Sequence, residues 1–405
     1  MSGGVDSSVA AAILKNAGHE VIGCFMRLGS PGERLDELAP FDDLPQSDCQ
    51  TQGPAVKLKI GHQGCCSIND AADARLVAAE LGIPFYVCNF KKDFGRIIDY
   101  FADEYLQGKT PNPCVRCNDW LKFGKLHEYA IQVGAHAVAS GHYAQILGGP
   151  RGGPLGSPLG GQSPQAGPST SPSLHRGLDH SKDQSYVLFG APRDRLSQML
   201  FPIGHLPKTE VRALAQKWGL PVFDKPDSQE ICFVPDQNYA ALVERLRPGA
   251  AKPGLIQDAK GSVVGRHQGQ HHFTIGQRRG VNVALGYPIY VTHKNPLSNT
   301  VTVGPKEALL VSECSAAEAN WLIDTPDAEI DVLAKYRYNT PAVPASVRVL
   351  PPSLAPSPSG RPGRFAVRFA EPQHAVAPGQ ALVLYRDDQV LGGGWIDSAI
   401  PSAQS

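Results

Sequence analysis

Apolar residues follow a helical spacing in several stretches of the first half of the chain. Just after residue 8 they recur at Val9, Ile13 and Ala17, which predicts a helix that ends before Gly18. Further helices are predicted over 70–81, 94–106, 120–133 and 208–218, and buried strands over 20–26, 84–90 and 137–143. Repeated β–α units of this length indicate a parallel sheet with helices on both faces.

Polar residues mark where two of these helices are expected to begin. Asn69 or Asp70 is expected to cap the helix over 70–81, because short polar side chains accept bonds from first-turn amides. Asp119 is expected to cap the helix over 120–133, after a loop that covers 108–118.

Beyond about residue 288 the pattern changes to short alternating strands that turn residues separate. These strands are predicted over 288–292, 300–303, 345–349, 365–369 and 381–385. Many short strands without intervening helices are typical of a small β-barrel. We therefore expect an α/β protein with a parallel-sheet domain over 1–235, a small central domain over 236–287 and a C-terminal β-barrel over 288–405.

Two stretches contain almost no large apolar residues. Residues 148–173 consist mainly of Gly, Pro, Ser and Gln, and a shorter stretch of this kind covers 351–363. Such segments cannot bury enough apolar surface to fold, so both are interpreted as insertions without a fold of their own. Residues 28–64 show no sustained period and are expected to form a long excursion.

The charges of the chain balance. Lys and Arg together number 38, as do Asp and Glu, so any polyanion must be met by local patches. The nine cysteines are an odd number in a chain of 405 residues, which favours reduced thiols over a disulfide framework. The sequence contains no apolar run of transmembrane length and no signal sequence. These features predict a cytoplasmic protein without membrane contacts.

Residues 2–8 read S-G-G-V-D-S-S and lead directly into the first predicted helix. The glycines let the backbone approach a ligand closely, amides at a helix N-terminus favour anions, and Asp6 can hold a metal ion. The stretch lacks the G-x-x-x-x-G-K-[ST] spacing and resembles the pyrophosphatase loop (PP-loop) of enzymes that split ATP into AMP and pyrophosphate. A Ser/Gly helix cap is the simpler alternative. Because such loops follow a buried strand and only Met1 precedes this one, we expect the true start to lie upstream.

Three cysteines lie in stretches that suggest chemistry. Residues 110–118 read T-P-N-P-C-V-R-C-N, in which Asn112 can read a base edge. Cys114 and Cys117 can form a redox couple, half of a zinc site or part of an iron–sulfur site. The sequence offers no second pair, so a complete structural zinc site is not expected. Cys232 lies alone in D-S-Q-E-I-C-F-V-P-D, and a lone cysteine is more often a small core residue.

A series of motifs extends this pattern along the whole chain. Besides residues 2–8 and 110–118, it consists of G-C-C-S at 64–67, S-G-H-Y-A at 140–144, K-D-Q-S-Y at 182–186, Q-E-I-C-F at 229–233, T-I-G-Q-R-R-G at 274–280, K-Y-R-Y-N at 335–339 and P-G-Q-A at 378–381. In this order the motifs resemble those of the tRNA-specific 2-thiouridylases. The two low-complexity insertions fall outside the resemblance.

The resemblance implies an adenine-nucleotide α-hydrolase-like first domain and an ATP-dependent sulfur transfer to the wobble uridine of tRNA. ATP, together with Mg²⁺, would bind Ser2, Gly3, Gly4, Val5, Asp6, Ser7, Ser8, Met26 and Gly141. The uridine 2-oxygen would attack the α-phosphate and release pyrophosphate. Cys232 would carry sulfur as a persulfide, received from a cysteine desulfurase or a relay protein. The nucleophile Cys117 would release that sulfur through a transient disulfide with Cys232, or attack directly.

The resemblance also implies contacts with the tRNA substrate. The target base would contact Asn112, Pro113 and Cys114, in a pocket that accepts a base flipped out of the anticodon. Other tRNA contacts would fall on His142, Lys182, Asp183, Gln184, Arg337, Tyr338 and Gln380. Arg and Lys suit phosphates and Tyr can stack on an unpaired base, although isolated residues of these types are mostly surface charges or structural residues. A monomer is expected.

One position departs from a common family pattern. Many members have Asp where this chain has Cys114, so any role that depends on that carboxylate is missing here. Cys114, Cys117 and Cys232 could instead hold three irons of a [4Fe–4S] cluster and leave one iron open to hydrosulfide. Cluster and persulfide therefore stand as rival hypotheses.

Two further alternatives concern the reaction as a whole. Another PP-loop enzyme could adenylate a carboxylate or amide oxygen and transfer nitrogen, but Cys117 and Cys232 would then have no purpose. A tRNA-binding protein with a disabled phosphate loop is the non-enzymatic alternative. Among the other cysteines, Cys24, Cys65, Cys66 and Cys88 are expected to serve packing, and Cys49 and Cys314 carry no signal.

Overall fold

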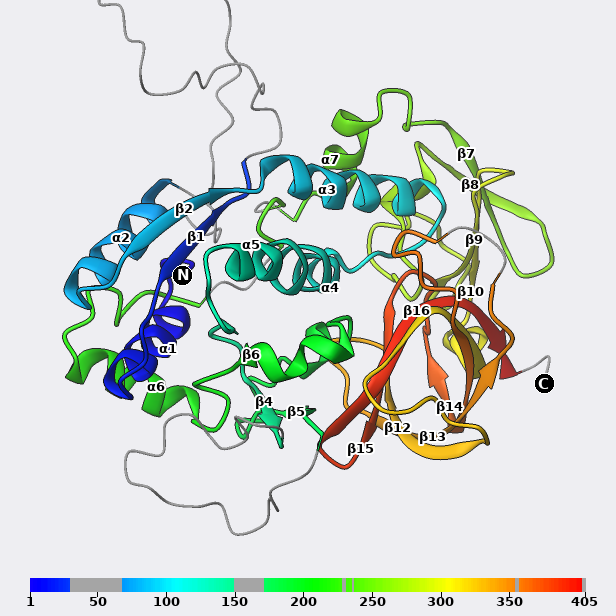
Figure 1. Ribbon diagram of the computed structural model, residues 1–405. Coiled ribbons are helices and arrows are strands. Elements are labelled where there is room, and N and C mark those ends of the chain that lie inside the picture. The colour runs from blue at the N-terminus through cyan, green and yellow to red at the C-terminus, as the bar shows by residue number, and fades with distance from the viewer. Residues whose placement is uncertain (30–67, 149–170, 228–230, 235–236, 354–356, 403–405) are drawn as a thin grey trace, which may run out of the picture.

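The first helix of the chain begins directly after the phosphate-loop candidate. The structure is a computed structural model that describes residues 1–29, 68–148, 171–227, 231–234, 237–353 and 357–402 (Figure 1). The G-C-C-S motif, Cys49, residues 149–170 of the longer low-complexity insertion and residues 354–356 of the shorter one lie outside these residues. Helix α1 covers Val5–Asn16, and Gly18 follows it with φ 84°, which confirms the predicted stop.

The N-terminal domain has the predicted parallel strand pairs with helices around them. Strand β1 (Gly23–Arg27) pairs in parallel with β2 (Phe85–Asn89), and β3 (Val138–Ala139) pairs in parallel with β6 (Met199–Leu200). The predicted strand over 137–143 is therefore cut short at residue 139. The helices around these pairs include α2 (Ile68–Glu80), α3 (Lys91–Leu106), α6 (Lys208–Lys217) and α7 (Tyr239–Leu246). Among the described residues, no helix is long and apolar enough to cross a membrane.

Two expected helix caps are wrong. Helix α2 already includes Ile68, so Asn69 and Asp70 lie inside its first turn. The helix expected at 120 begins instead at Pro113, and Asp119 lies in its interior. Asn112 is the cap, since its Oδ1 accepts a hydrogen bond from the amide of Val115 (3.4 Å). Proline at the first helical position is preorganised for this role.

The helix that starts at Pro113 changes its winding at Cys117. Segment α4 (Pro113–Arg116) continues into a π-helix, η1 (Cys117–Lys125), and then into α5 (Leu126–Gln132). π-helical segments are rare and often occur at functional sites. Cys117 is the first residue of this segment. The predicted loop over 108–118 therefore ends at Asn112.

The central domain contains strands that the sequence pattern assigns to the C-terminal barrel. Its sheet has the order β8-β7-β10-β9, and these strands cover Gly254–Gln257 (β7), Val263–His267 (β8), Tyr290–Asn295 (β9) and Thr300–Gly304 (β10). Strand β10 pairs in parallel with β7, 45 residues earlier at Thr300↔Leu255. Both β domains have the same short alternating pattern, so the pattern cannot say which sheet a strand joins.

The C-terminal strands close into the expected barrel. They are β11 (Leu310–Trp321), β12 (Ile330–Lys335), β13 (Val343–Leu350), β14 (Arg364–His374), β15 (Ala381–Arg386) and β16 (Gln389–Pro401). The sheet order β11-β14-β13-β12-β15-β16 closes through an additional β11–β16 pairing. Strands β4 (Ala144–Leu147) and β5 (Ser173–Arg176) extend this sheet from β16. Figure 1 shows the barrel beside the helix that begins at α4.

The first domain and the barrel share a hydrophobic core, and a buried ion pair crosses it. One cluster contains Val115 and Phe123 together with Val383 and Trp395 of the barrel. The guanidinium of Arg116 donates two hydrogen bonds to Glu318 of β11 (2.9 and 2.7 Å), and both side chains are almost fully buried. Burial opposes ionisation of Glu318, but the bonds from Arg116 lower its pKa below the ordinary value.

Aromatic rings surround the Arg116 guanidinium and replace the water that it loses. Its central carbon lies 4.0 Å from the ring centroid of Trp395, 4.7 Å from that of Tyr100 and 5.0 Å from that of Trp120. A desolvated cation gains most from such ring contacts. A second pair, Arg361 with Asp119 (3.0 Å), joins the same helix to the barrel. The helix is therefore held in place by the C-terminal domain.

Removing the charge of Arg116 should destabilise the protein strongly. In Arg116→Met, Glu318 is left as a buried charge without its partner, which costs about 3–5 kcal/mol in the free energy of unfolding. Urea denaturation followed by tryptophan fluorescence measures the loss. The control Arg193→Gln breaks the exposed pair with Asp324 (2.7 Å), which should cost no more than about 1 kcal/mol. Equal losses in both variants would contradict this role of Arg116.

Candidate nucleotide and thiol site

The loop before α1 has the geometry of an anion cradle. Gly4 is the N-cap residue and no side chain caps the helix, so the first-turn amides are not satisfied by a cap. Gly3 has φ 71°, and a Cβ there would lie 2.3 Å from the carbonyl oxygen of Asp70. The hydroxyl groups of Ser7 and Ser8 both donate to the Gly4 carbonyl (3.2 and 2.8 Å). Only glycine fits at position 3.

Gly141 lies directly against the first turn of α1. A Cβ at this position would lie 2.6 Å from the carbonyl carbon of Asp6 and 2.6 Å from the amide nitrogen of Ser7. Met26, the other residue predicted near the nucleotide, lies on β1 and is partly buried. The structure therefore brings Gly141 to the predicted loop and leaves Met26 on the neighbouring strand.

Asp6 belongs to a network of charges that the sequence analysis missed. Its Oδ1 accepts hydrogen bonds from the Tyr143 hydroxyl (2.9 Å) and from Lys208 Nζ (2.7 Å). Lys208 also contacts Asp227 (2.8 Å), whose other oxygen accepts from Lys182 (3.1 Å). Burial opposes ionisation of Asp227, but the bonds from Lys208 and Lys182 lower its pKa to about 2. Lys208 is the first residue of the helix predicted over 208–218, and Asp227 is the first residue of the D-S-Q-E-I-C-F-V-P-D stretch. Their contact depends on the fold, so neither position marks it in the sequence.

Lys225 holds the loop from the other side. Its Nζ donates to Asp70 (2.6 Å), to Asp73 (2.6 Å) and to the carbonyl of Gly3 (3.0 Å). This lysine thus connects the first turn of α2 with the predicted loop. No motif identified Lys225, because its partners lie more than 150 residues earlier in the chain.

The structure places Cys117 and Cys232 against one hydrophobic cluster. Both are partly buried, whereas Cys114 is exposed. The segment that carries Cys232 is anchored by Phe233, whose ring meets Phe94 and Phe101 of α3 edge-on (centroids 5.6 and 5.3 Å apart). Within the described residues, the three cysteines are not among the side chains whose ligand atoms all lie within 4.8 Å of one another, so they do not form a single-ion site.

The other described cysteines occupy the core, as expected for two of them. Cys24 of β1 and Cys88 of β2 lie with their Sγ atoms 3.0 Å apart. Burial and the hydrogen bond with Cys88 raise the pKa of Cys24 to about 12. Cys314 is fully buried in the barrel, and burial raises the pKa of its thiol. Such high pKa values disfavour the reactive thiolate form.

The predicted target-base residues form the start of the helix over 113–132, the thiol helix, which carries Cys117. Asn112 caps it, Pro113 occupies its first position and Cys114 points its carbonyl at Asn118 Nδ2 (3.1 Å). The ring of Tyr338 is 40% exposed. Burial raises its pKa, and the nearby Asp183 and Cys114 raise it further. An exposed aromatic ring near Cys114 offers a stacking surface for an unpaired base.

Several residues predicted to contact tRNA make hydrogen bonds inside the protein. The side chain of Gln380 donates to the Thr110 carbonyl (2.6 Å), and that of Gln184 accepts from the Tyr143 amide (3.0 Å). Arg337 donates to the carbonyls of Ala375 (2.8 Å) and Ile275 (3.3 Å) and so joins the barrel to the central domain.

His142 and Asp183, also predicted to contact tRNA, are buried and make hydrogen bonds inside the protein. The Nδ1 of His142 lies 2.7 Å from the Ser140 hydroxyl and its Nε2 lies 3.2 Å from Lys122 Nζ. Burial, together with Lys122, holds its pKa well below the ordinary value. Asp183 accepts from the amides of Gly177 and Ser185 (3.1 and 3.0 Å). Of the predicted set, Lys182 and Tyr338 are the more exposed.

These residues fit a nucleotide with its metal ion. The uncapped amides of α1 and the lysines around Asp227 suit phosphate oxygens. The carboxylate of Asp6 is about one-third exposed and suits Mg²⁺, which prefers oxygen ligands. The arrangement defines a nucleotide-binding α/β protein with a thiol-bearing helix and two β domains.

Comparisons with known proteins agree with this class and narrow it. Family models match along the chain: "tRNA methyl transferase HUP domain" at residues 1–236, "tRNA methyl transferase PRC-barrel domain" at 244–305 and "Aminomethyltransferase beta-barrel domain" at 311–396. The chain belongs to the tRNA-specific 2-thiouridylase family, a family of sulfur-transferring enzymes.

Curated relatives match this chain over nearly its whole length. The tRNA-specific 2-thiouridylase MnmA of Rhodopirellula baltica is 44% identical and the match covers 99% of this chain and 96% of the relative. Those of Rhodospirillum centenum and Geobacter metallireducens are 43% and 42% identical, with 98% and 99% of this chain covered, and 90% and 96% of the relative.

A methyl group at Gly141 should weaken nucleotide binding. In Gly141→Ala the new Cβ meets the backbone of Asp6 and Ser7, and overpacking of this kind costs about 1–3 kcal/mol. The affinity for ATP, measured by calorimetry with Mg²⁺ present, is expected to fall about tenfold or more. Gly95→Ala is the matched control, because a Cβ there meets nothing within 4 Å. Unchanged ATP affinity in Gly141→Ala would refute the assigned position of the nucleotide.

Proposed function

We propose that this enzyme catalyses ATP-dependent 2-thiolation of the wobble uridine of tRNA, through an adenylated base and a cysteine persulfide. The observation that carries the proposal is the combination of an uncapped glycine loop at α1 with two partly buried cysteines against one cluster. The first feature suits ATP cleavage between the α- and β-phosphates, and the second suits a sulfur relay. An enzyme that transfers nitrogen needs no such thiols.

The first step activates the uridine. Its 2-oxygen attacks the α-phosphorus of ATP, the bond to the β-phosphate oxygen breaks and pyrophosphate leaves. The amides of α1, with Lys208 and Lys182 near Asp227, stabilise the negative charge of the leaving group. Mg²⁺, when bound, would neutralise further phosphate charge next to Asp6. Ser2, Gly3, Gly4, Val5, Ser7 and Ser8 surround the phosphates in this scheme, with Met26 and Gly141 beside the nucleoside.

The second step replaces oxygen by sulfur. The terminal sulfur of a Cys232 persulfide attacks C2, and AMP leaves with the original oxygen. The Cys117 thiolate then attacks Cys232 Sγ, which leaves sulfur on the base and a Cys117–Cys232 disulfide; a dithiol reductant restores both thiols. Alternatively, Cys117 attacks first and the released hydrosulfide attacks C2. A cysteine desulfurase or relay protein reloads Cys232.

The tRNA contacts divide into two groups in this proposal. Tyr338 and Lys182, together with Asn112, Pro113 and Cys114, meet the flipped-out base or the anticodon backbone. His142, Asp183, Gln184, Arg337 and Gln380 act on the tRNA through the segments that their hydrogen bonds support. We further propose that the enzyme works in the cytoplasm as a monomer.

A [4Fe–4S] cluster on Cys114, Cys117 and Cys232 is the second candidate route for sulfur. The exposed Cys114, three residues before Cys117, is the observation that favours it. Iron and acid-labile sulfide assays after anaerobic reconstitution separate the two routes. Iron-free protein that still thiolates tRNA would eliminate the cluster.

Replacing either relay cysteine should abolish thiolation. With ATP and a sulfur source, mass spectrometry of tRNA is expected to detect 2-thiouridine for the wild type and none for Cys117→Ser or Cys232→Ser. Cys232→Ser should still release pyrophosphate in the presence of tRNA, because activation precedes sulfur transfer. Cys314→Ala is the control, since that thiol is buried in the barrel, and should thiolate normally. Thiolation by both serine variants would contradict the proposed mechanism.

A further inference from the structure

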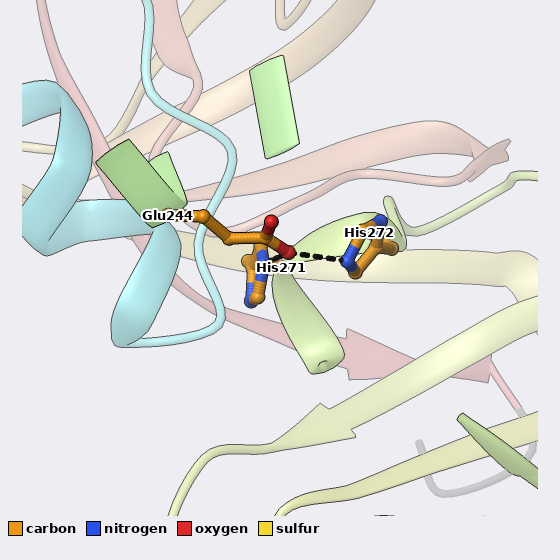
Figure 2. A group of neighbouring side chains, drawn as sticks. All are labelled: Glu244, His271 and His272. Carbon is orange, nitrogen blue, oxygen red and sulfur yellow. Dashed lines mark hydrogen bonds and ion pairs between the residues drawn. The ribbon is translucent and has the colours of Figure 1, made fainter. Parts of the chain in front are cut away.

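Three metal-ligating side chains converge outside the proposed nucleotide and thiol site. Glu244 Oε1 lies 3.0 Å from His271 Nε2 and 2.9 Å from His272 Nε2. Among the described residues, these are the side chains whose possible ligand atoms all lie within 4.8 Å of one another. Figure 2 shows both rings turned toward the same carboxylate.

Local backbone structure explains how two adjacent histidines can face one point. They lie in a short 3-10 turn, η4 (Gln270–His272), with ring centroids 4.5 Å apart. The ring of His271 folds back over Gly269, where a Cβ would lie 2.3 Å from its Cε1. Any larger residue at 269 would therefore push His271 out of this arrangement.

Both sides of the cluster are anchored on the same helix, α3. On one side, Gln270 of η4 donates to the Leu106 carbonyl (2.7 Å). On the other side, Arg247 directly after α7 contacts Asp99 and Asp103 (both 2.9 Å). Glu244 and the histidines thus approach each other from two anchored elements. Such preorganisation is what a metal site requires of its supporting residues.

We propose that Glu244, His271 and His272 form a binding site for a divalent ion of the zinc class. Two imidazole nitrogens and a carboxylate are typical zinc ligands, at about 2.0–2.2 Å from the ion. At these distances tetrahedral ligand atoms lie about 3.3 Å apart, close to the observed 2.9 and 3.0 Å. The site joins α7, which follows the Cys232 segment, to the central domain.

The exposure of the three side chains indicates how deeply the ion would be bound. The side chain of His271 is 1% exposed, whereas Glu244 and His272 are 37% and 40% exposed. The ion would therefore be bound at the surface with a buried ligand behind it, and water would complete its coordination. Its role is to hold α7 against η4, so it is independent of ATP cleavage and sulfur transfer.

Cobalt binding to the whole chain tests the site, because Co²⁺ replaces Zn²⁺ and reports its ligands. Nitrogen and oxygen ligands give d–d bands without the intense charge-transfer band of a thiolate, which separates this site from the cysteines. We expect one such Co²⁺ per chain, displaced by Zn²⁺. Zn²⁺ should also raise the melting temperature of the wild type.

The variants assign the signal to the three residues. Glu244→Gln and His272→Gln should each weaken Co²⁺ binding more than about tenfold, since even lost supporting residues cost about 10–100-fold. Both should also lose the Zn²⁺-dependent rise in melting temperature. His272→Gln changes an exposed side chain and should therefore fold. His293→Gln and Glu307→Gln are matched controls, because both side chains are exposed in the same domain, and should bind as the wild type does.

Two results would overturn the proposal. One is the absence of any cobalt band that is free of thiolate character; the other is unchanged binding in both Glu244→Gln and His272→Gln. Either would mean that the cluster consists of hydrogen bonds between histidines and a carboxylate only. Thiolation of tRNA is measured separately, so this result leaves the proposed function untouched.

Discussion

The buried contact between Arg116 and Glu318 determines where the thiol helix lies. These residues are 202 positions apart, and their bidentate pair crosses the boundary between the first domain and the barrel. Cys117 directly follows Arg116, so the same contact fixes the start of the π-helical segment. Arg361 and Asp119 repeat the connection one turn further on. The barrel therefore holds this helix, and with it Cys117, in position.

Further contacts hold the segments that lie next to the thiol helix. Gln380 holds the Thr110 carbonyl, and Gly379 is required beside Lys109 because a Cβ there would lie 2.8 Å from the lysine Cβ. Asn118 donates to the carbonyls of Cys114 and Val187 (3.1 and 3.2 Å). Gln380 and Asn118 thus hold the segments that carry the predicted site residues. Substitutions at such positions would displace Cys117 or the turn that begins at Asn112.

Much of the fold follows from local patterns, and the exceptions have physical reasons. Periodicity predicted α1, α3 and α6, and glycines with positive φ end α1 at Gly18 and α2 at Gly82. The start of the thiol helix was missed because residues 108–118 were interpreted as a loop, although proline is favoured at the first helical position. Strands β9 and β10 were assigned to the C-terminal barrel, although they belong to the central sheet. Tertiary contacts determine which strands pair, and the alternating pattern does not encode them.

Some residues of the candidate site can be recognised from the sequence, and others only from the fold. The glycines of the loop and the cysteine motifs are visible in the sequence, since their chemistry is local. Lys208, Asp227 and Lys225 are not, because each acquires its role only when distant segments meet. The cluster of Glu244 with His271 and His272 has no spacing that would mark it, as its ligands come from α7 and η4.

The central claim is that the nucleotide loop and the thiols serve one reaction on one atom of the uridine. The most direct test uses tRNA whose wobble uridine carries ¹⁸O at C2, with ATP and a sulfur source. Mass spectrometry of the products should find the heavy oxygen in AMP, in an amount equal to the 2-thiouridine formed. AMP without the label, alongside thiolated tRNA, would contradict activation of the base by ATP.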